Sequence, residues 1–203
     1  MIQIIDYKAG NAPSVLNAVT HLGYKARYAR QPSDLANAAQ IILPGVGSAR
    51  ATMDSLREMN LLAPLEEAVL QKKTPFLGIC VGMQILFEHS QEEDTSCLGW
   101  LRGKVVRFDG ERVRVPQMGW NLVALSDSPA NAALRDYFYF VNSFYAQPAQ
   151  PSDIWGQSDY NGPFVSAVCR DNIYAVQFHL EKSGGAGLAL LNRLIASGGD
   201  GKC

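Results

Sequence analysis

One cysteine in this sequence has neighbours that suit it to chemistry. Cys80 stands between Gly78 and Gly82, after the apolar run 74–77 and before the helical pattern of residues 83–87. A strand that ends in a sharp turn before a helix is a nucleophile elbow, and the glycines leave room that a β-carbon would fill. The start of a helix also favours a thiolate. Because so short a pattern is weak evidence, an inert cysteine buried in an ordinary strand-to-helix turn is the alternative.

A base for this cysteine must come from one of three histidines. His21 ends a predicted helix and is expected at the surface, and His89 lies too far along the predicted elbow helix to reach back to Cys80. His179 closes the last predicted strand, and Glu181 follows two residues later, so both side chains point to one face if the strand continues. A carboxylate there can hold the imidazole in one tautomer, the third role in a catalytic triad. The alternative is a chance pairing of the two residues.

The first half of the chain alternates short apolar runs with amphipathic segments, a pattern that predicts a parallel sheet covered by helices on both faces. In such folds the functional site lies at the carboxyl ends of the strands. The predicted strands are 2–6, 25–29, 41–43 and 76–79, and the predicted helices are 11–22, 34–38 with Ser33 as N-cap, 49–59, 61–71 and 81–89.

The second half changes character, because short strands and turn residues replace the alternation. Antiparallel strands are predicted at 103–108, 112–116, 121–124 and 137–141, followed by a last strand at 173–179 and a closing helix at 187–195. The predicted fold class is therefore α/β, with a mixed, mostly parallel sheet flanked by helices and antiparallel additions in the second half. A single domain is predicted over residues 1–196, with a disordered tail at 197–203.

Composition narrows the classes of function. The 203 residues are 47% hydrophobic and 18% charged, as in an ordinary globular domain, and the net charge of −1 gives no reason to expect a nucleic-acid partner. No apolar run approaches the roughly 20 residues of a membrane span. The first residues read as a strand and not as a signal peptide, which predicts a cytoplasmic protein. The four cysteines form no CxxC pair, so no structural zinc or other metal site is expected.

Two motifs together resemble those of the class I (triad) glutamine amidotransferases. They are Gly78-Ile-Cys80-Val-Gly82-Met-Gln84 and Gln177-Phe-His179-Leu-Glu181-Lys-Ser183. Further segments resemble the glutaminase subunits of imidazole glycerol phosphate synthases: residues 6–11 with the following Ser14-Val15, Pro44-Gly-Val-Gly47, 116–121 and 139–145. The matches come in the same order and cover residues 2 to about 195.

The resemblance implies a glutaminase in which Cys80 attacks the side-chain carbonyl of glutamine, with His179 as acid and base and Glu181 as its orienter. The Val81 backbone N–H is a natural oxyanion donor in an elbow, and the second donor would come from Val46 or Gly47. By position in the family pattern, glutamine is bound by Gln84, Glu92, Ser143 and Phe144. Alternatives stay open for several of these residues: a plain strand-end turn at 44–47, a helix-surface Gln84, and a solvated acidic stretch around Glu92.

The resemblance also implies a partner, a (β/α)₈-barrel cyclase that uses the ammonia to form imidazole glycerol phosphate and AICAR in histidine biosynthesis. Ammonia is protonated in neutral water and then is no nucleophile, so it should pass directly to the acceptor. The predicted interface residues are Asn11, Met118, Trp120, Asn121 and Lys182, although Trp120 would also fit a buried core position. Glutaminase activity should be low in the isolated chain, and no cofactor is implied.

Some residues depart from the pattern of these relatives, and three rival functions remain. Leu180 stands where proline usually separates the catalytic pair, Asn142 replaces a histidine, and Lys8 and Ala12 replace a glycine and a leucine.

The rival functions are a subunit of another class I amidotransferase with a different acceptor, a cysteine hydrolase or peptidase without a partner, and a binding module that has kept the fold without catalysis.

Overall fold

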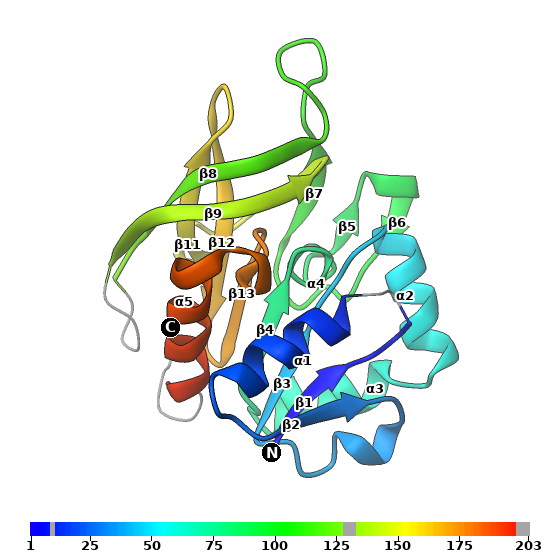
Figure 1. Cartoon of the computed structure of the whole chain (residues 1–203). Helices are drawn as coiled ribbons and strands as arrows, with labels where there is room; N and C mark the ends of the chain where they lie inside the picture. Colours follow the sequence, from blue (N-terminus) through cyan, green and yellow to red (C-terminus); the bar gives the residue numbers. More distant parts are fainter. Residues whose placement is uncertain (9–10, 128–132, 198–203) are drawn as a thin grey trace.

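The computed structural model describes residues 1–8, 11–127 and 133–197. Its strands form one mixed sheet (Figure 1). They are β1 (Ile2–Ile5), β2 (Ala26–Ala29), β3 (Gln40–Leu43), β4 (Phe76–Ile79), β5 (His89–Ser90), β6 (Thr95–Ser96), β7 (Gly103–Arg107), β8 (Gln117–Leu125), β9 (Leu134–Asn142), β10 (Phe144–Pro148), β11 (Ile154–Asp159), β12 (Pro163–Arg170) and β13 (Ile173–Val176).

The helical segments include five α-helices and several single turns. The α-helices are α1 (Ala12–His21), α2 (Ala49–Glu58), α3 (Leu62–Glu66), α4 (Val81–Gln84) and α5 (Gly184–Ala196). The short 3₁₀ segments are η1 (Pro32–Asp34), η3 (Glu92–Asp94), η4 (Pro151–Asp153) and η5 (Leu180–Lys182), and η2 (Glu67–Gln71) is a π-helical continuation of α3.

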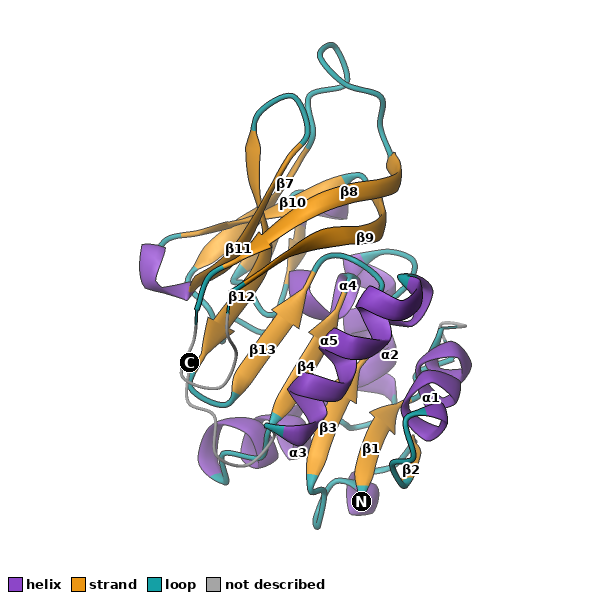
Figure 2. Ribbon diagram, turned by 60° about the vertical axis from the view of Figure 1, so that its left-hand side comes forward, coloured by secondary structure: helices purple, strands orange, loops and turns teal. Residues whose placement is uncertain are grey.

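The helix-flanked part of the sheet is parallel throughout, in the order β2-β1-β3-β4-β13. Helices α1 and α5 cover one face and α2 and α3 the other (Figure 2). Every residue of β1, β3, β4 and β13 is buried, as expected for strands covered on both faces. The predicted α/β class with a parallel core is therefore confirmed.

Antiparallel strands extend this sheet, as the sequence predicted. Strand β12 runs antiparallel to β13 and is followed by β10 and β7, while β11 joins β12 to the long pair β8–β9. Figures 1 and 2 both show β8 and β9 beyond the carboxyl ends of the parallel strands. In this pair Trp120 faces Tyr139 and Leu122 faces Tyr137, whereas the alternate residues Val123, Phe138 and Phe140 are buried. One face of β8–β9 thus belongs to the core and the other is open.

The elbow helix is much shorter than predicted, which corrects the placement of His89. Helix α4 ends at Gln84, and His89 lies in β5 and contacts Asp94. The reason is tertiary: the carbonyls of Ile85, Leu86 and Phe87 accept hydrogen bonds from Leu98, Leu101 and Gly99 instead of continuing a helix. The side chains of Ile85, Leu86 and Phe87 are all fully buried. Three consecutive residues of a helix would not all point to its one buried face.

Three further local predictions are wrong. The last strand ends at Val176, because Gln177 N–H turns to the Ser166 carbonyl and His179 N–H to the Tyr139 carbonyl. Residues 34–38 form no helix; the turn Pro32–Asp34 is held by the Asp34 carboxylate, and Ser33 is exposed within it. Residues 112–116 are turns and not a strand.

The predicted domain, residues 1–196, contains all of these elements. Of the predicted tail, Ser197 caps α5 through its N–H to the Arg193 carbonyl, and residues 198–203 lie outside the described part of the chain. Within the described residues, none of the helices combines the length and the apolarity needed to cross a bilayer.

Candidate active site

Cys80 occupies a strained elbow between β4 and α4. Its backbone lies at φ 56° and ψ −111°, a conformation that L-residues rarely adopt. Both flanking glycines are required by close backbone contacts: a β-carbon on Gly82 would lie 2.0 Å from the Leu43 carbonyl oxygen, and one on Gly78 would lie 2.6 Å from the Gly82 carbonyl oxygen. The structure therefore has the sharp turn that the glycine spacing predicted, with Cys80 at the carboxyl end of a central strand.

His179 and Glu181 come together next to this cysteine, although not in the way predicted. His179 precedes the 3₁₀ turn Leu180–Lys182, so the two side chains do not share the face of a strand. The turn nevertheless brings His179 Nδ1 within 2.9 Å of Glu181 Oε1, and His179 also hydrogen-bonds to Cys80. The three side chains form a Cys–His–Glu constellation whose histidine and glutamate side chains are almost completely shielded from solvent.

Asn11 is the residue that sequence reasoning placed in a different role. Its Nδ2 donates a 3.0 Å hydrogen bond to the same Oε1 of Glu181, and its side chain is buried. Glu181 Oε2 has no hydrogen-bond partner among the described residues. Asn11 is the N-cap residue of α1, so this contact ties the start of that helix to the carboxylate. A pattern in the sequence could not reveal this contact, because 170 positions separate the two residues.

The electrostatics favour a charged pair. Burial alone would lower the pKa of His179, but its hydrogen-bonding and electrostatic interactions with Cys80 and Glu181 raise this pKa to about 10. Burial would raise the pKa of Glu181, but the hydrogen bond and positive charge of His179 and the hydrogen bond from Asn11 lower it. The histidine is therefore an imidazolium at neutral pH, ready to give up a proton.

The His179 backbone is held from two sides. Its N–H donates to the Tyr139 carbonyl at 2.9 Å, and its own carbonyl accepts a 2.6 Å hydrogen bond from the Ser183 hydroxyl. The Ser183 hydroxyl oxygen also accepts the Tyr139 N–H at 2.9 Å. Strand β9 and the residue that precedes α5 thus fix the His179 backbone, and Leu180 in place of proline leaves these hydrogen bonds intact.

A cavity of about 310 Å³ opens beside the cysteine. It collects most of the residues that the sequence predicted for catalysis, oxyanion stabilisation and substrate binding, one predicted for the interface, and three that it did not predict. The predicted ones are Val46, Gly47, Cys80, Val81, Gln84, Glu92, Ser143, Phe144, His179 and the interface residue Lys182, and the others are Pro116, Val141 and Asn142.

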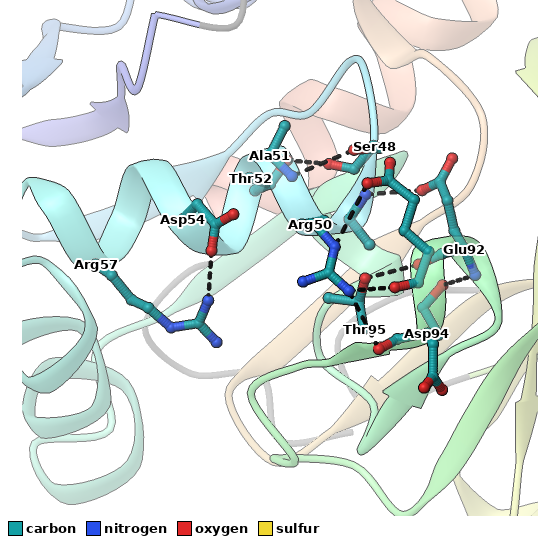
Figure 3. A network of polar contacts seen from close by, with 12 residues as sticks. Ser48, Arg50, Ala51, Thr52, Asp54, Arg57, Glu92, Asp94 and Thr95 are labelled. Atoms are coloured by element: carbon teal, nitrogen blue, oxygen red, sulfur yellow. Dashed lines mark hydrogen bonds and ion pairs between the residues drawn. The ribbon is translucent and has the colours of Figure 1, made fainter.

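Glu92 is neither fully solvated nor free in this cavity. Its Oε2 accepts a 2.7 Å hydrogen bond from the Ala49 N–H at the start of α2, and its carbonyl accepts one from the Thr95 hydroxyl (Figure 3). Burial raises the pKa of Glu92, more than the Ala49 hydrogen bond lowers it. The structure thus holds this carboxylate at the cavity wall, where it could meet an ammonium group.

Gln84 and Gln177 form a buried pair that reaches the cysteine. Gln84 Nε2 donates to the Phe144 carbonyl at 3.2 Å and to Gln177 Oε1 at 3.0 Å, and Gln177 Nε2 lies 3.6 Å from Cys80 Sγ. Gln84 is therefore not a helix-surface residue. Gln177 was part of the motif around His179, yet its contact with the sulfur is a feature that sequence reasoning missed.

The family model for "Glutamine amidotransferase class-I" matches residues 3–195. The chain belongs to the class-I glutamine amidotransferases. Curated relatives named "Imidazole glycerol phosphate synthase subunit HisH" include one from Thiobacillus denitrificans, 42% identical over 96% of this chain and 90% of that protein. Others come from Rhodopirellula baltica, 43% identical over 97% and 98% of the two chains, and from Dehalococcoides mccartyi, 44% identical over 94% of each.

Solved structures share the fold of this amidotransferase at much lower identity. "Crystal structure of glutamine amidotransferase" superposes with a TM-score of 0.74 at 16% identity and covers 97% of this chain and 98% of its own. "Structure of PurLQS from Thermotoga maritima" gives a TM-score of 0.72 at 14% identity, over 97% and 95% of the two chains. At these identities the likeness supports the α/β fold alone.

The segment 44–47 of this amidotransferase packs directly on the elbow. A β-carbon on Gly45 would lie 2.6 Å from Val81 Cβ and 2.7 Å from the Gly82 nitrogen. Burial raises the pKa of Tyr7 to about 12, although hydrogen bonds from Thr52 and from the Val46 backbone act in the opposite direction. Gly47 lies at φ 96°, where glycine is favoured.

The predicted interface residues of this amidotransferase lie in different environments. Met118 and Trp120 are 66% and 57% exposed, so the core position considered for Trp120 is excluded. Lys182 is exposed at the cavity, whereas Asn121 donates to the Asp159 carbonyl and Asn11 is buried against Glu181. These placements leave Met118 and Trp120 of β8, together with Lys182, as the exposed part of the predicted interface.

The departures from the family pattern have local structural accounts. Lys8 lies at φ 68°, the left-handed region in which glycine is favoured, at a cost of about 1 kcal/mol for another residue. Asn142 is buried and donates to the Phe144 carbonyl, so a neutral side chain satisfies that position.

Proposed function

We propose that this chain is the glutaminase subunit of an imidazole glycerol phosphate synthase and hydrolyses L-glutamine through a cysteine thioester. The observation that carries the proposal is the pairing of the strained Cys80 with a buried His179–Glu181 ion pair at the wall of a cavity. Relatives at 40–44% identity over nearly the whole chain, all named for that synthase, support the choice of acceptor and of histidine biosynthesis as the pathway.

The reaction follows from the charged state of the pair. The Cys80 thiolate attacks the side-chain carbonyl carbon of glutamine and forms a tetrahedral oxyanion. The His179 imidazolium gives its proton to the nitrogen, the C–N bond breaks, and ammonia leaves behind a thioester. Neutral His179 then takes a proton from water, the hydroxide adds to the thioester, and collapse returns the thiolate and releases glutamate. Glu181, held by Asn11, stabilises the imidazolium in each half of the cycle.

The remaining roles extend the same cavity. The Val81 N–H is one oxyanion donor, and the second comes from Val46 or Gly47. The second donor becomes available when the peptide between Val46 and Gly47 reorients, which Gly47 at φ 96° permits more readily than another residue would. Gln84, Glu92, Ser143 and Phe144 bind glutamine, with the Glu92 carboxylate facing the α-ammonium group.

The partner is a (β/α)₈-barrel cyclase that docks on the open face of β8–β9. Met118, Trp120 and Tyr137 are large, apolar and more than half exposed on that face, which is unusual for a surface in contact with water. Trp120 packs edge-to-face on Tyr139, whose carbonyl holds His179, so the face is one residue away from the catalytic base. Asn121 of β8 and Lys182 at the cavity belong to the same proposed interface. The cytoplasmic location predicted from the sequence stays a prediction.

Glutaminase turnover with and without the cyclase tests this function. The chain is co-expressed with a barrel cyclase, and glutamate release is measured for the chain alone, for the complex, and for the complex with the cyclase ligand. We expect a slow chain and an increase of at least about fivefold in the liganded complex. Rapid turnover of glutamine by the chain alone would favour the cysteine hydrolase, and stimulation by a different synthase instead of the cyclase would favour another class I acceptor.

A further inference from the structure

Gln177 lies between a predicted substrate-binding residue and the nucleophile, and it has no role in the mechanism above. Its side chain is fully buried, directly after the end of β13. Its oxygen is 3.0 Å from Gln84 Nε2, and its nitrogen is 3.6 Å from Cys80 Sγ. A buried amide so close to a reactive sulfur matters only if the nitrogen, and not the oxygen, faces that sulfur.

A backbone carbonyl decides this orientation. The Phe144 carbonyl oxygen can only accept hydrogen bonds, and Gln84 Nε2 lies 3.2 Å from it. The amino group of Gln84 must therefore face Phe144, and the same nitrogen offers its second hydrogen to Gln177. If Gln177 were turned round, two amino groups would face each other in a buried site, and neither would find an acceptor there. The direction of the whole series is thus set by the main chain of β10.

We propose that Gln177 is a positioning residue that donates a hydrogen bond to the Cys80 sulfur and stabilises its thiolate form. The role rests on the proposed function, in which Cys80 is the nucleophile. A thiolate accepts hydrogen bonds more strongly than a thiol or a thioester, so the contact favours the resting nucleophile and the sulfur that leaves when the thioester is hydrolysed. Gln84 then has two tasks, since it lines the glutamine cavity and orients Gln177.

This contact differs from that of His179 in one useful respect. The imidazole gives up its proton to the leaving ammonia and regains one from water, so its charge at the sulfur changes during the reaction. The amide of Gln177 does not titrate and donates throughout. The two donors come from the same segment, residues 177–179. Its backbone donates one hydrogen bond to β12, from Gln177 to Ser166, and one to β9, from His179 to Tyr139.

The test compares two substitutions at this position with a matched control. Gln177→Met keeps the length of the side chain without a donor, and Gln177→Glu keeps its shape and still accepts from Gln84 but places an acceptor at the sulfur. The control is Gln40→Met, because Gln40 is buried on β3 and loses a hydrogen bond of similar kind, from its Nε2 to the Leu194 carbonyl at 3.3 Å.

The measurement is the rate at which iodoacetamide alkylates Cys80 in the full chain, followed by mass spectrometry of the peptide that contains it, from about pH 6 to about pH 9. We expect alkylation about tenfold slower at neutral pH for Gln177→Met, slower still for Gln177→Glu, and a profile displaced to higher pH for both. Gln40→Met should stay within about twofold of the parent. Thermal unfolding of each variant shows that the comparison is made on folded protein.

Equal alkylation of Gln177→Met and Gln40→Met would overturn the proposal, as would an unchanged profile for Gln177→Glu. If Gln177→Met does not fold, Gln177→Glu decides alone, because it retains the bond to Gln84. The assay does not depend on glutamine. Failure of the complex to hydrolyse glutamine would therefore reject the proposed function without touching this result, and an unchanged alkylation rate would reject the role of Gln177 without touching that function.

Discussion

The catalytic end of the cavity and the open face of β8–β9 are neighbouring regions that differ in solvent exposure and in how fully their side chains are paired. At the catalytic end, the side chains of His179 and Glu181 are almost fully shielded, and each makes hydrogen bonds with residues distant in the sequence. On the β8–β9 face, Met118, Trp120 and Tyr137 are more than half exposed. Tyr139 joins the two regions, because its carbonyl holds the His179 backbone and its ring packs on Trp120.

This contrast separates what the chain supplies alone from what it leaves to a partner. A buried ion pair needs exact hydrogen-bond partners within the same chain, or it costs stability. An apolar exposed face needs another surface to cover it. Cys80, His179 and Glu181 thus come together within this one chain, whereas the apolar face next to them stays uncovered.

Removal of the nucleophile gives the largest effect and breaks the comparison at its catalytic end. Cys80→Ala should reduce glutamine-dependent synthase turnover by a factor on the order of 10³ or more, because no other group can form the thioester. Turnover with added ammonium salt should stay unchanged, since ammonia then bypasses the cavity. The assay is product formation by the complex with either nitrogen source. Glutamine use that survives the substitution would show that the mechanism is wrong.

The next effect tests the open face. Trp120→Ala should weaken cyclase binding by roughly thirtyfold, about 2 kcal/mol, because a large exposed aromatic residue is the type that dominates interface energetics. Titration calorimetry with the purified cyclase measures it.

The matched control is Tyr28→Ala, on β2 at the far edge of the sheet, where Arg30 stacks on the ring. This aromatic substitution should leave cyclase binding unchanged. Equal affinities for the parent and the Trp120 variant would place the interface elsewhere.

Asn11 has been assigned to both regions: the sequence predicted that it lies at the interface, and the structure shows its side chain hydrogen-bonded to Glu181. Asn11→Ala should lower the glutaminase kcat of the complex about five- to tenfold through loss of one hydrogen bond to a charged group. The KM for glutamine should stay unchanged, since the residue does not line the cavity. Cyclase affinity, measured in the same titration, distinguishes the roles: a loss of affinity with unchanged kcat would support the interface alone.

The smallest effect is the response of stability to acid. The folded pKa of Glu181 is lowered, so its contribution is present above its unfolded pKa of about 4.3 and is lost as the pH falls through the folded value. His179 remains protonated in both states over that window, because its unfolded pKa is about 6.5 and its folded pKa is higher. The free energy of unfolding should therefore fall less steeply with acid in Glu181→Gln than in the parent.

Denaturant unfolding below about pH 5 measures this slope. Asp54→Asn is the control, since Asp54 lies in an exposed pair with Arg57 that contributes little to stability. Parallel acid profiles for the parent and the Glu181 variant would contradict a charged His179–Glu181 pair.

The sequence predicted the parallel core well because its signals are local. The runs that became β1, β3 and β4 are short, apolar and bounded by turn residues, and burial on both faces demands that composition. It predicted the elbow for the same reason, since glycines at 78 and 82 answer contacts within a few residues and with the adjacent strand. Predictions from local patterns were wrong at residues 85–87 and 177–179. There the backbone groups form hydrogen bonds with residues distant in the sequence and do not continue the predicted helix or strand.

The amino-acid sequence by itself determined the family and the helix-flanked sheet, and it predicted the nucleophile, its base and its orienter, because these depend on residue type, order and near spacing. Only the tertiary structure decided that Glu181 meets His179 through a 3₁₀ turn, that Asn11 holds the carboxylate, and that Gln177 faces the sulfur. Those contacts join segments as far as 170 positions apart. Their geometry depends on how the strands of the folded sheet place their ends next to one another. A hydrogen bond between such distant segments produces no periodic pattern in the amino-acid sequence, so the sequence alone does not reveal it.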